Sequence, residues 1–345
     1  MSEQTAVNTT MPNTLVWDVC GHENIINYLK SIIVGNRLSH AYIFAGQKGL
    51  GKKNIVDKFV KALYCRGQGD FRPCEECASC RQISAGSHPD VYRLQRINNA
   101  KTEKLYRDLT IGQIRDLKHI LSQTTLLSGW KVAIIENAED LNINSANSLL
   151  KVLEEPSAKT IIILITNDLS QLPKTVISRC QVLNFLPVAR QKIRDYLDSF
   201  EGLSDKQKDF IAYVSFGRPQ SAKDLAEDSA VLDDFIASWK SFYGFFGSSL
   251  ASRLKVLTDI IPSGVEEARS VMRADLLFDW WLSALVPLLP GEDSGVEILK
   301  FYDLHPPQLS DQDITKVYQL IMNAKKKFDN NTTAKNILEN LIINI

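Results

Sequence analysis

The sequence predicts a parallel α/β domain in the first half of the chain and helices alone in the second half. In the first half, short apolar runs of strand length alternate with amphipathic helical patterns. Because most of these runs are continuously apolar, they are expected to be buried on both faces, as in a parallel sheet covered by helices. From about Gln191 onward no convincing strand follows, and residues 334–345 repeat apolar side chains at a period of about 3.6.

Each element follows from its own pattern. Ile25, Ile26, Leu29, Ile32 and Ile33 recur at helical spacing and predict the first helix. The predicted strands are residues 41–45, 91–94 (the weakest), 132–135 and 161–165. The further predicted helices are residues 52–64, a face at 114–121, a stripe at 146–153 ended by Pro156, and one face at 235–246.

These patterns divide the chain into four parts. Residues 1–15 are polar and are predicted to form a disordered tail. The α/β domain takes residues 16–187, a small helical domain takes 188–229, and a larger helical domain takes 230–345. A chain of 345 residues has room for two or three such domains of about 100–200 residues each.

The charge balance limits the function classes. Forty Lys and Arg residues meet forty Asp and Glu residues, so the net charge is zero. A protein that gripped DNA mainly by neutralising phosphates would be clearly basic. The first residues carry no apolar leader, and no apolar stretch is long enough to span a bilayer, so a soluble, cytoplasmic protein is expected. Its six cysteines should then stay reduced, and clustered cysteines indicate metal before disulfides.

A glycine-rich turn joins the first strand to its helix and nearly matches the phosphate-binding pattern G-x-x-x-x-G-K-[S/T]. Gly46, Gly49 and Gly51 let backbone N–H groups turn toward phosphate oxygens, and the helix N-terminus adds positive potential. Lys52 holds the place of the phosphate-binding lysine. Lys53 replaces the hydroxyl that coordinates Mg²⁺ and cannot ligate a cation. The sequence predicts an inherited P-loop in which binding of ATP or ADP is left open; the alternative is a turn that binds nothing.

A second catalytic element is also altered. The strand at residues 131–135 ends in Glu136 and Asn137, where P-loop ATPases place Asp and Glu. Glu136 can still help to hold the water around an ion. Asn137 cannot take a proton from an attacking water at neutral pH. The alternative is an alignment error, but Glu139 and Asp140 lie several residues past the strand end.

Four cysteines lie within a segment of 16 residues. Cys65, Cys74, Cys77 and Cys80 have the ligand types and the x2 spacings that suit tetrahedral Zn²⁺, and four protein ligands predict a structural site. The short charged linkers between them favour tight turns over helix. The alternative is that His88 supplies the fourth ligand in place of Cys65, although His88 fits better in a turn before the next strand.

Several short strings in the first domain resemble a known family. They are residues 40–44 (HAYIF), 147–156 (NSLLKVLEEP), 166–168 (TND) and 178–180 (SRC). Together they are similar to the gamma/tau and delta-prime subunits of the bacterial DNA polymerase III clamp loader, over about residues 16–185. This resemblance implies an AAA+ domain with a zinc module at residues 65–80, a small helical lid domain and an all-α C-terminal collar for oligomerisation.

The resemblance also implies roles for individual residues. Ser-Arg-Cys carries an arginine finger in that family, so Arg179 is expected to act in trans on the ATP site of a neighbouring subunit. The alternative is an arginine that bonds to free carbonyls at a helix C-terminus. ATP-hydrolysing relatives have a sensor arginine in the second domain. Here Gln220 stands in that place, Arg218 lies two residues earlier, and the role of Arg218 is open.

The loop lysine is kept, the hydroxyl and the base are lost, and the finger is kept. This combination indicates a non-hydrolysing clamp-loader subunit of the delta-prime type, within a DNA polymerase holoenzyme. The resemblance implies a five-subunit ring with gamma/tau and delta subunits, which meets the sliding clamp and primer–template DNA, and no membrane. An active gamma/tau-type ATPase is the main alternative, which Lys53 and Asn137 disfavour. A zinc-based nucleic-acid-binding regulator is disfavoured by the neutral charge, and the basic run at residues 325–327 is expected to be a solvated helix face.

Overall fold

The computed structural model describes most of the chain and divides it into two compact units. The described residues are 14–15, 17–67, 71–96, 109–123, 125, 129–157, 159–260, 267–289, 295–328 and 334–345. The first unit is residues 1–189 with 218–220, and the second is residues 190–217 with 221–345. The predicted disordered tail lies outside the described residues, apart from Thr14 and Leu15. The division into an α/β, a lid and a collar domain stays a prediction.

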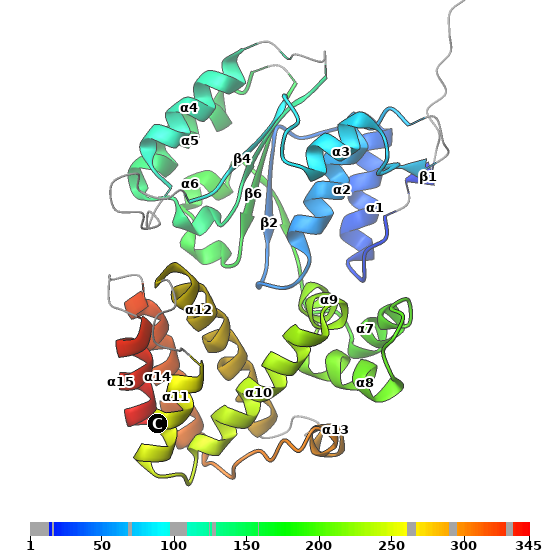
Figure 1. The fold of residues 1–345 in the computed structure, drawn as a ribbon. Coiled ribbons are helices and arrows are strands. Elements are labelled where there is room, and N and C mark those ends of the chain that lie inside the picture. The colour runs from blue at the N-terminus through cyan, green and yellow to red at the C-terminus, as the bar shows by residue number, and fades with distance from the viewer. Residues whose placement is uncertain are drawn as a thin grey trace, which may run out of the picture. The chain divides into compact units, whose positions relative to one another are not determined.

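A five-stranded parallel sheet forms the centre of the first unit, in the order β4-β5-β6-β2-β7 (Figure 1). The strands are β2 (Ala41–Ala45), β4 (Val91–Leu94), β5 (Lys131–Ile135), β6 (Thr160–Thr166) and β7 (Gln181–Asn184). In the register, Ala45 lies opposite Thr166 on one side and Asn184 on the other. Because all strands run the same way, their carboxyl ends meet at one edge of the sheet.

Successive residues of the central strands enter two different hydrophobic clusters. Tyr42, Phe44 and Ile134 pack in the cluster with α1 and α2, whereas Ile43 and Ile135 pack in the cluster with α4, α5 and α6. This alternation follows from the pleat of a strand, which points successive side chains to opposite faces. The helices are α1 (Glu23–Val34), α2 (Lys52–Tyr64), α4 (Ile111–Ser122), α5 (Ile143–Glu154) and α6 (Lys174–Ile177). The sheet buried on both faces confirms the predicted fold class of this half.

The described residues of the second unit form helices and connecting segments, with no strand among them. Its helices are α7 (Arg190–Leu197), α8 (Asp205–Val214), α9 (Pro219–Glu227), α10 (Ser229–Phe245), α11 (Leu250–Ile260), α12 (Glu267–Ala284), α13 (Val296–Phe301), α14 (Asp311–Phe328) and α15 (Ala334–Asn344). An aromatic core joins α10 to α12, where Trp239, Phe242 and Trp281 are fully buried and the Phe242 and Trp281 rings stack at 5.8 Å. None of the described helices combines the length and the apolar character that a bilayer span requires.

The structure corrects or completes the prediction at four short elements. Helix α3 (Ala78–Ser84) begins directly after Cys77, so Cys80 lies on a helix and the expectation of turns throughout the cysteine segment was wrong. Strand β7 was not predicted, because it is short and its ends are exposed. Strands β1 (Thr14–Leu15) and β3 (Phe71–Arg72) pair in a separate two-stranded sheet.

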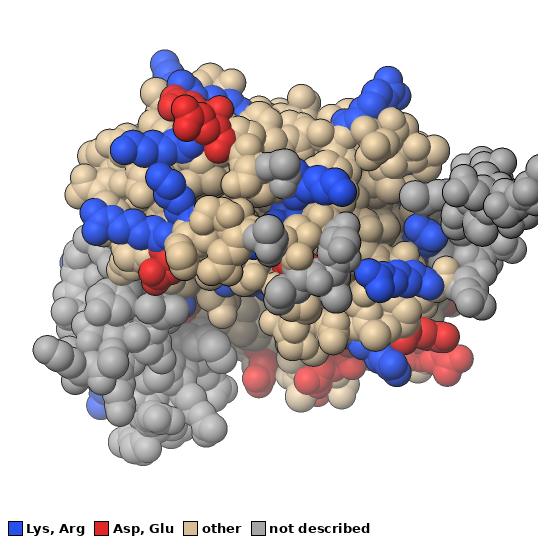
Figure 2. All heavy atoms as spheres, turned by 90° about the horizontal axis from the view of Figure 1, so that it is seen from above, with Lys and Arg blue, Asp and Glu red and all other residues tan. Residues whose placement is uncertain are grey.

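The charged side chains are mixed on the surface. On the face shown in Figure 2, the Lys and Arg side chains are spread over the surface and Asp and Glu side chains lie among or beside them. The basic run at the end of α14, residues 325–327, also has acidic side chains beside it. Lys325 is half-buried and bonds to Asp279, with Asp275 at 3.4 Å, whereas Lys326 and Lys327 are exposed. Basic and acidic side chains therefore balance in the whole sequence and also pair locally, as Lys325 does with Asp279.

Candidate functional site

The carboxyl edge of the sheet gathers the predicted site residues. The glycine-rich loop follows β2, Glu136 follows β5, and Asn167 follows β6. The loop needs glycine for space as well as for its left-handed backbone. At Gly46, with φ 147°, a Cβ would lie 2.5 Å from the backbone oxygen of Phe185. The sequence motif therefore folds into a compact loop held against the sheet.

Lys52 is turned back onto its own loop. Its Nζ donates to the backbone oxygen of Gly46, to that of Gln47 at 2.7 Å, and to Asn167 Oδ1 at 3.1 Å. An ammonium has three donors, and these contacts use all three. Burial lowers the pKa of Lys52 to about 8, and the nearby Glu139 carboxylate opposes that change. A phosphate would have to displace these protein acceptors in order to reach the ammonium.

Lys53 and Glu136 form an ion pair across the site. Lys53 Nζ lies 2.5 Å from Glu136 Oε2, and Arg93 Nη1 lies 3.4 Å from Glu136 Oε1. Arg93, on β4, also bonds to Asp57 on α2. The Glu136 side chain is only 11% exposed. The two positions that should organise Mg²⁺ are instead paired with each other, so the residues present do not fit that ion.

The carboxylates near Asn137 are also engaged. Asn137 has φ 49°, a left-handed conformation that asparagine tolerates better than most residues. Glu139 accepts hydrogen bonds from the Asn167 side-chain amide at 2.8 Å and from its backbone N–H. Asp140 Oδ2 lies 3.0 Å from Arg96 Nε. Because Glu139 and Asp140 are already bonded to other protein groups, neither replaces the general base that is lost at Asn137.

The segment with the altered sensor lies next to the glycine-rich loop. The backbone N–H of Gln220, in the first turn of α9, donates to the backbone oxygen of Gly49 at 2.8 Å. Gly217, at φ 74°, ends the preceding turn. The assignment of Gln220 to the sensor position stays a prediction, and the role of Arg218 stays open.

Arg179 follows α6 and forms contacts of two kinds. Its Nη2 lies 2.7 Å from Glu154 Oε1, and its Nη1 donates to the backbone oxygen of Thr175 at 2.9 Å. The second contact is the helix-terminal bonding that was the alternative to a finger role. The Arg179 side chain is 35% exposed, so its guanidinium is accessible from solvent. The finger role stays a prediction.

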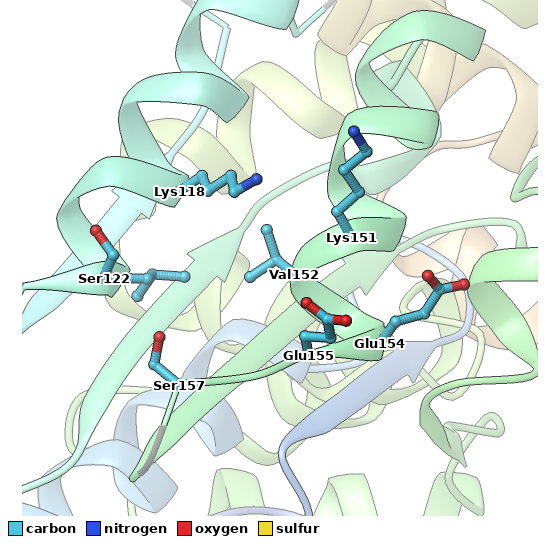
Figure 3. Close-up of a pocket in the computed structure, with 8 residues that line it drawn as sticks. Lys118, Ser122, Lys151, Val152, Glu154, Glu155 and Ser157 are labelled. Atoms are coloured by element: carbon cyan, nitrogen blue, oxygen red, sulfur yellow. The ribbon is translucent and has the colours of Figure 1, made fainter.

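Glu154 lies at the C-terminal end of α5, beside a pocket between α4 and α5 (Figure 3). In Figure 3 its carboxylate extends away from Lys118, which comes from α4. The pocket is lined by Lys118, Leu121, Ser122, Lys151, Val152, Glu154, Glu155 and Ser157. No residue of the glycine-rich loop is among them, so this pocket is distinct from the nucleotide-type site.

The structure brings the four predicted cysteines together. The sulfur atoms of Cys65, Cys74, Cys77 and Cys80 all lie within 4.8 Å of one another. A tetrahedral site with Zn–S bonds of about 2.3 Å needs sulfur atoms about 3.8 Å apart, so the donor set fits zinc. His88 does not join the group, and its Nδ1 accepts the backbone N–H of Asp90.

The surrounding backbone also favours thiolate ligands. The N–H groups of Cys74 and Cys77 donate to the sulfur atoms of Cys65 and Cys74, each at 3.3 Å. A Cβ on Gly67 would lie 2.8 Å from the Cys74 sulfur, so only glycine fits there. Burial raises the pKa of the Cys65 and Cys80 thiols. Metal binding would therefore release protons and would weaken at low pH.

The cysteine segment is attached to α2 by one carboxylate. Glu75, between Cys74 and Cys77, lies 2.8 Å from Lys58 Nζ and also bonds to Lys61. Burial opposes ionisation of Glu75, but the hydrogen bonds from these two lysines outweigh it and lower the pKa of the carboxyl group. An ionic contact thus joins the cysteine segment to the helix of the glycine-rich loop.

Several partners in this site were not predicted. Arg93 and Asp57 complete the pairing of Glu136, Asn167 binds Lys52, and Glu154 binds Arg179. Only the pairing of Arg93 could have been suspected from the sequence, because Arg93 is a charged residue inside a predicted apolar strand. The other pairings join distant parts of the chain and depend on the order of the strands.

A parallel sheet in the order β4-β5-β6-β2-β7, with a glycine-rich loop after β2 and an acidic residue after β5, is a fold of the P-loop type. Residues 21–189 match the family model described as DNA polymerase III, delta subunit. Over these residues the chain is similar to subunits of DNA polymerase III, which confirms the predicted resemblance.

Several known proteins are similar to the chain over most of its length. The chain is 28% identical to DNA polymerase III subunit delta-prime of Bacillus subtilis (strain 168) over 321 residues, which covers 92% of this chain and 94% of the relative. It is also 28% identical to DNA polymerase III subunit tau of the same organism, covering 82% of this chain but only 52% of the relative. A solved gamma subunit-related protein from Thermotoga maritima is 19% identical, with a TM-score of 0.47, over 92% of this chain and 97% of that one.

Proposed function

We propose that this chain is a clamp-loader subunit of the delta-prime type, which does not hydrolyse ATP itself. The observation that carries this proposal is the loss of two catalytic groups at the carboxyl edge of the sheet. Lys53 stands in place of the metal-binding hydroxyl, and Asn137 stands in place of the general base. The similarity to the delta-prime subunit of Bacillus subtilis, which covers 92% of this chain, supports a clamp-loader subunit of this kind.

In this proposal the chain acts on a neighbour. Arg179 supplies its guanidinium to the ATP site of an adjacent gamma/tau subunit, where it stabilises the charge that develops on the transferred phosphoryl group. The ring contains gamma/tau and delta subunits beside this chain, and it loads the sliding clamp onto primer–template DNA in the cytoplasm. The C-terminal helices hold the subunit in that ring. Zinc at the four cysteines has a structural role.

The isolated chain is expected to release no phosphate from ATP above background. Without a hydroxyl for Mg²⁺ and a base for water, the chemical step has no activated nucleophile. The measurement is steady-state phosphate release by the purified chain, with Lys52→Ala as the control for contaminating ATPases. Turnover that Lys52→Ala abolishes would reject the proposal and support an active gamma/tau-type ATPase.

Glu154→Gln is expected to raise ATP turnover by the assembled complex by up to about fivefold. The Glu154 carboxylate competes with phosphoryl oxygens for the N–H groups of Arg179, and an exposed ion pair of this kind contributes about 0.2–1 kcal/mol. The matched control is Glu155→Gln, which removes the neighbouring exposed carboxylate. A fall in turnover with Glu154→Gln alone would show that Glu154 positions the finger productively instead of restraining it.

A further inference from the structure

The ammonium of Lys53 lies where P-loop ATPases organise a divalent cation. Lys53 is the second residue of α2, directly after the lysine of the glycine-rich loop, and its Nζ lies 2.5 Å from Glu136 Oε2. Glu136 is the first residue after β5, at the carboxyl edge of the sheet. The side chain of Lys53 is 59% exposed and that of Glu136 is 11% exposed. The lysine therefore approaches from the solvent side and covers the carboxylate.

The other oxygen of the same carboxylate faces a second cation. Arg93 Nη1 lies 3.4 Å from Glu136 Oε1, and the Arg93 guanidinium also bonds to Asp57 in the second turn of α2. Two cationic and two anionic side chains thus form one chain of contacts from Lys53 through Glu136 and Arg93 to Asp57. Its charges balance, so the buried carboxylate is neutralised entirely by protein groups.

A divalent cation does not fit this arrangement. Mg²⁺ requires oxygen ligands in near-octahedral geometry, whereas a lysine ammonium has only donors. An ammonium and a Mg²⁺ ion at the same carboxylate would also repel each other. The neighbouring Lys52 is likewise bonded to protein oxygens, two from the loop backbone and one from Asn167.

We propose that Lys53 is a built-in substitute for the nucleotide-associated divalent cation, so that this site has become independent of Mg²⁺. The inference deepens the proposed function, on which it rests, by naming the group that closes the site. Lys53 excludes the metal, and Asn137 separately removes the base. Replacing Lys53 alone by the hydroxyl residue of the P-loop pattern should then recover Mg²⁺-dependent nucleotide binding without recovering hydrolysis.

The test compares binding of a fluorescent ATP analogue to the full-length chain, with MgCl2 and with EDTA. For the unaltered chain, the dissociation constants in the two buffers are expected to agree within about twofold, because no site for the ion is available. For Lys53→Thr, Mg²⁺ is expected to tighten binding by about tenfold or more, the scale on which single groups change metal affinity. Lys53→Arg keeps the cation and is expected to behave as the unaltered chain does.

Each arm can overturn the inference. Mg²⁺-enhanced binding by the unaltered chain would overturn it without any variant, so the test does not depend on the folding of Lys53→Thr. A Lys53→Thr chain that melts cooperatively but gains no Mg²⁺ dependence would also overturn it, with Lys53→Ser as the second hydroxyl variant. Phosphate release by the unaltered chain is a separate result, which would reject the proposed function instead.

Discussion

Arg179→Ala is expected to slow ATP hydrolysis at the facing site of the assembled complex by a factor of about 10³–10⁵, the scale measured for arginine fingers supplied in trans. Alanine removes the guanidinium and leaves the transition-state charge without this partner. Ring assembly should be nearly unchanged, because Arg179 bonds within its own unit to the exposed Glu154 and to a backbone oxygen. The expected loss is therefore catalytic.

The measurement is single-turnover ATP hydrolysis by the reconstituted complex, with co-elution in gel filtration as the readout of assembly. Single-turnover conditions matter because other ATP sites in the ring would mask the loss in a steady-state rate. Arg179→Lys is the matched variant: it keeps one positive charge but loses the planar fork, so it should recover part of the rate at most. Unchanged single-turnover kinetics in Arg179→Ala would leave Arg179 with only its structural contacts to Glu154 and Thr175.

Cys77→Ser is expected to reduce the zinc content from about one ion per chain to well below one and to destabilise the first unit by about 3 kcal/mol or more. The four sulfur atoms lie in one group, so the loss of one leaves an incomplete tetrahedron. For a domain of this size, that change corresponds to a fall of about 6–12 °C in the melting temperature.

The measurements are metal analysis of the purified chain and thermal melting followed by circular dichroism. Cys180→Ser is the control, since Cys180 lies outside the cluster and its replacement should leave the zinc content unchanged. Removal of the metal from the unaltered chain by a chelator should reproduce the melting shift of Cys77→Ser. A metal-free chain with unaltered melting would count against a structural site.

The strands were predictable to within a residue because their burial leaves a simple mark on the sequence. The runs at β2, β5 and β6 are buried along their whole length, and apart from polar residues at the ends of β5 and β6 they are apolar. The edge strand β7 has only Leu183 fully buried, so it carried no comparable signal. Helix α3 was missed for a different reason: its first turn carries a cysteine whose spacing indicated metal binding and turns.

The residues of the site that belong to short sequence motifs could be predicted, but their partners could not. Gly46, Lys52 and the four cysteines were found from spacing alone, because each motif is local in the chain. The partners of these residues are not local: Arg93 lies 43 residues from Glu136, and Asn167 lies 115 residues from Lys52. Which residues meet in this way depends on the order β4-β5-β6-β2-β7, which no single segment encodes.

Helix α2 connects the glycine-rich loop to the cysteine segment, which are two separate motifs in the sequence. Lys52 begins the helix beside the glycine-rich loop. Lys58 and Lys61 pair with Glu75 of the cysteine segment, about 9 and 14 Å farther along at a rise of about 1.5 Å per residue. Helix α2 is thus the element that the glycine-rich loop and the cysteine segment have in common.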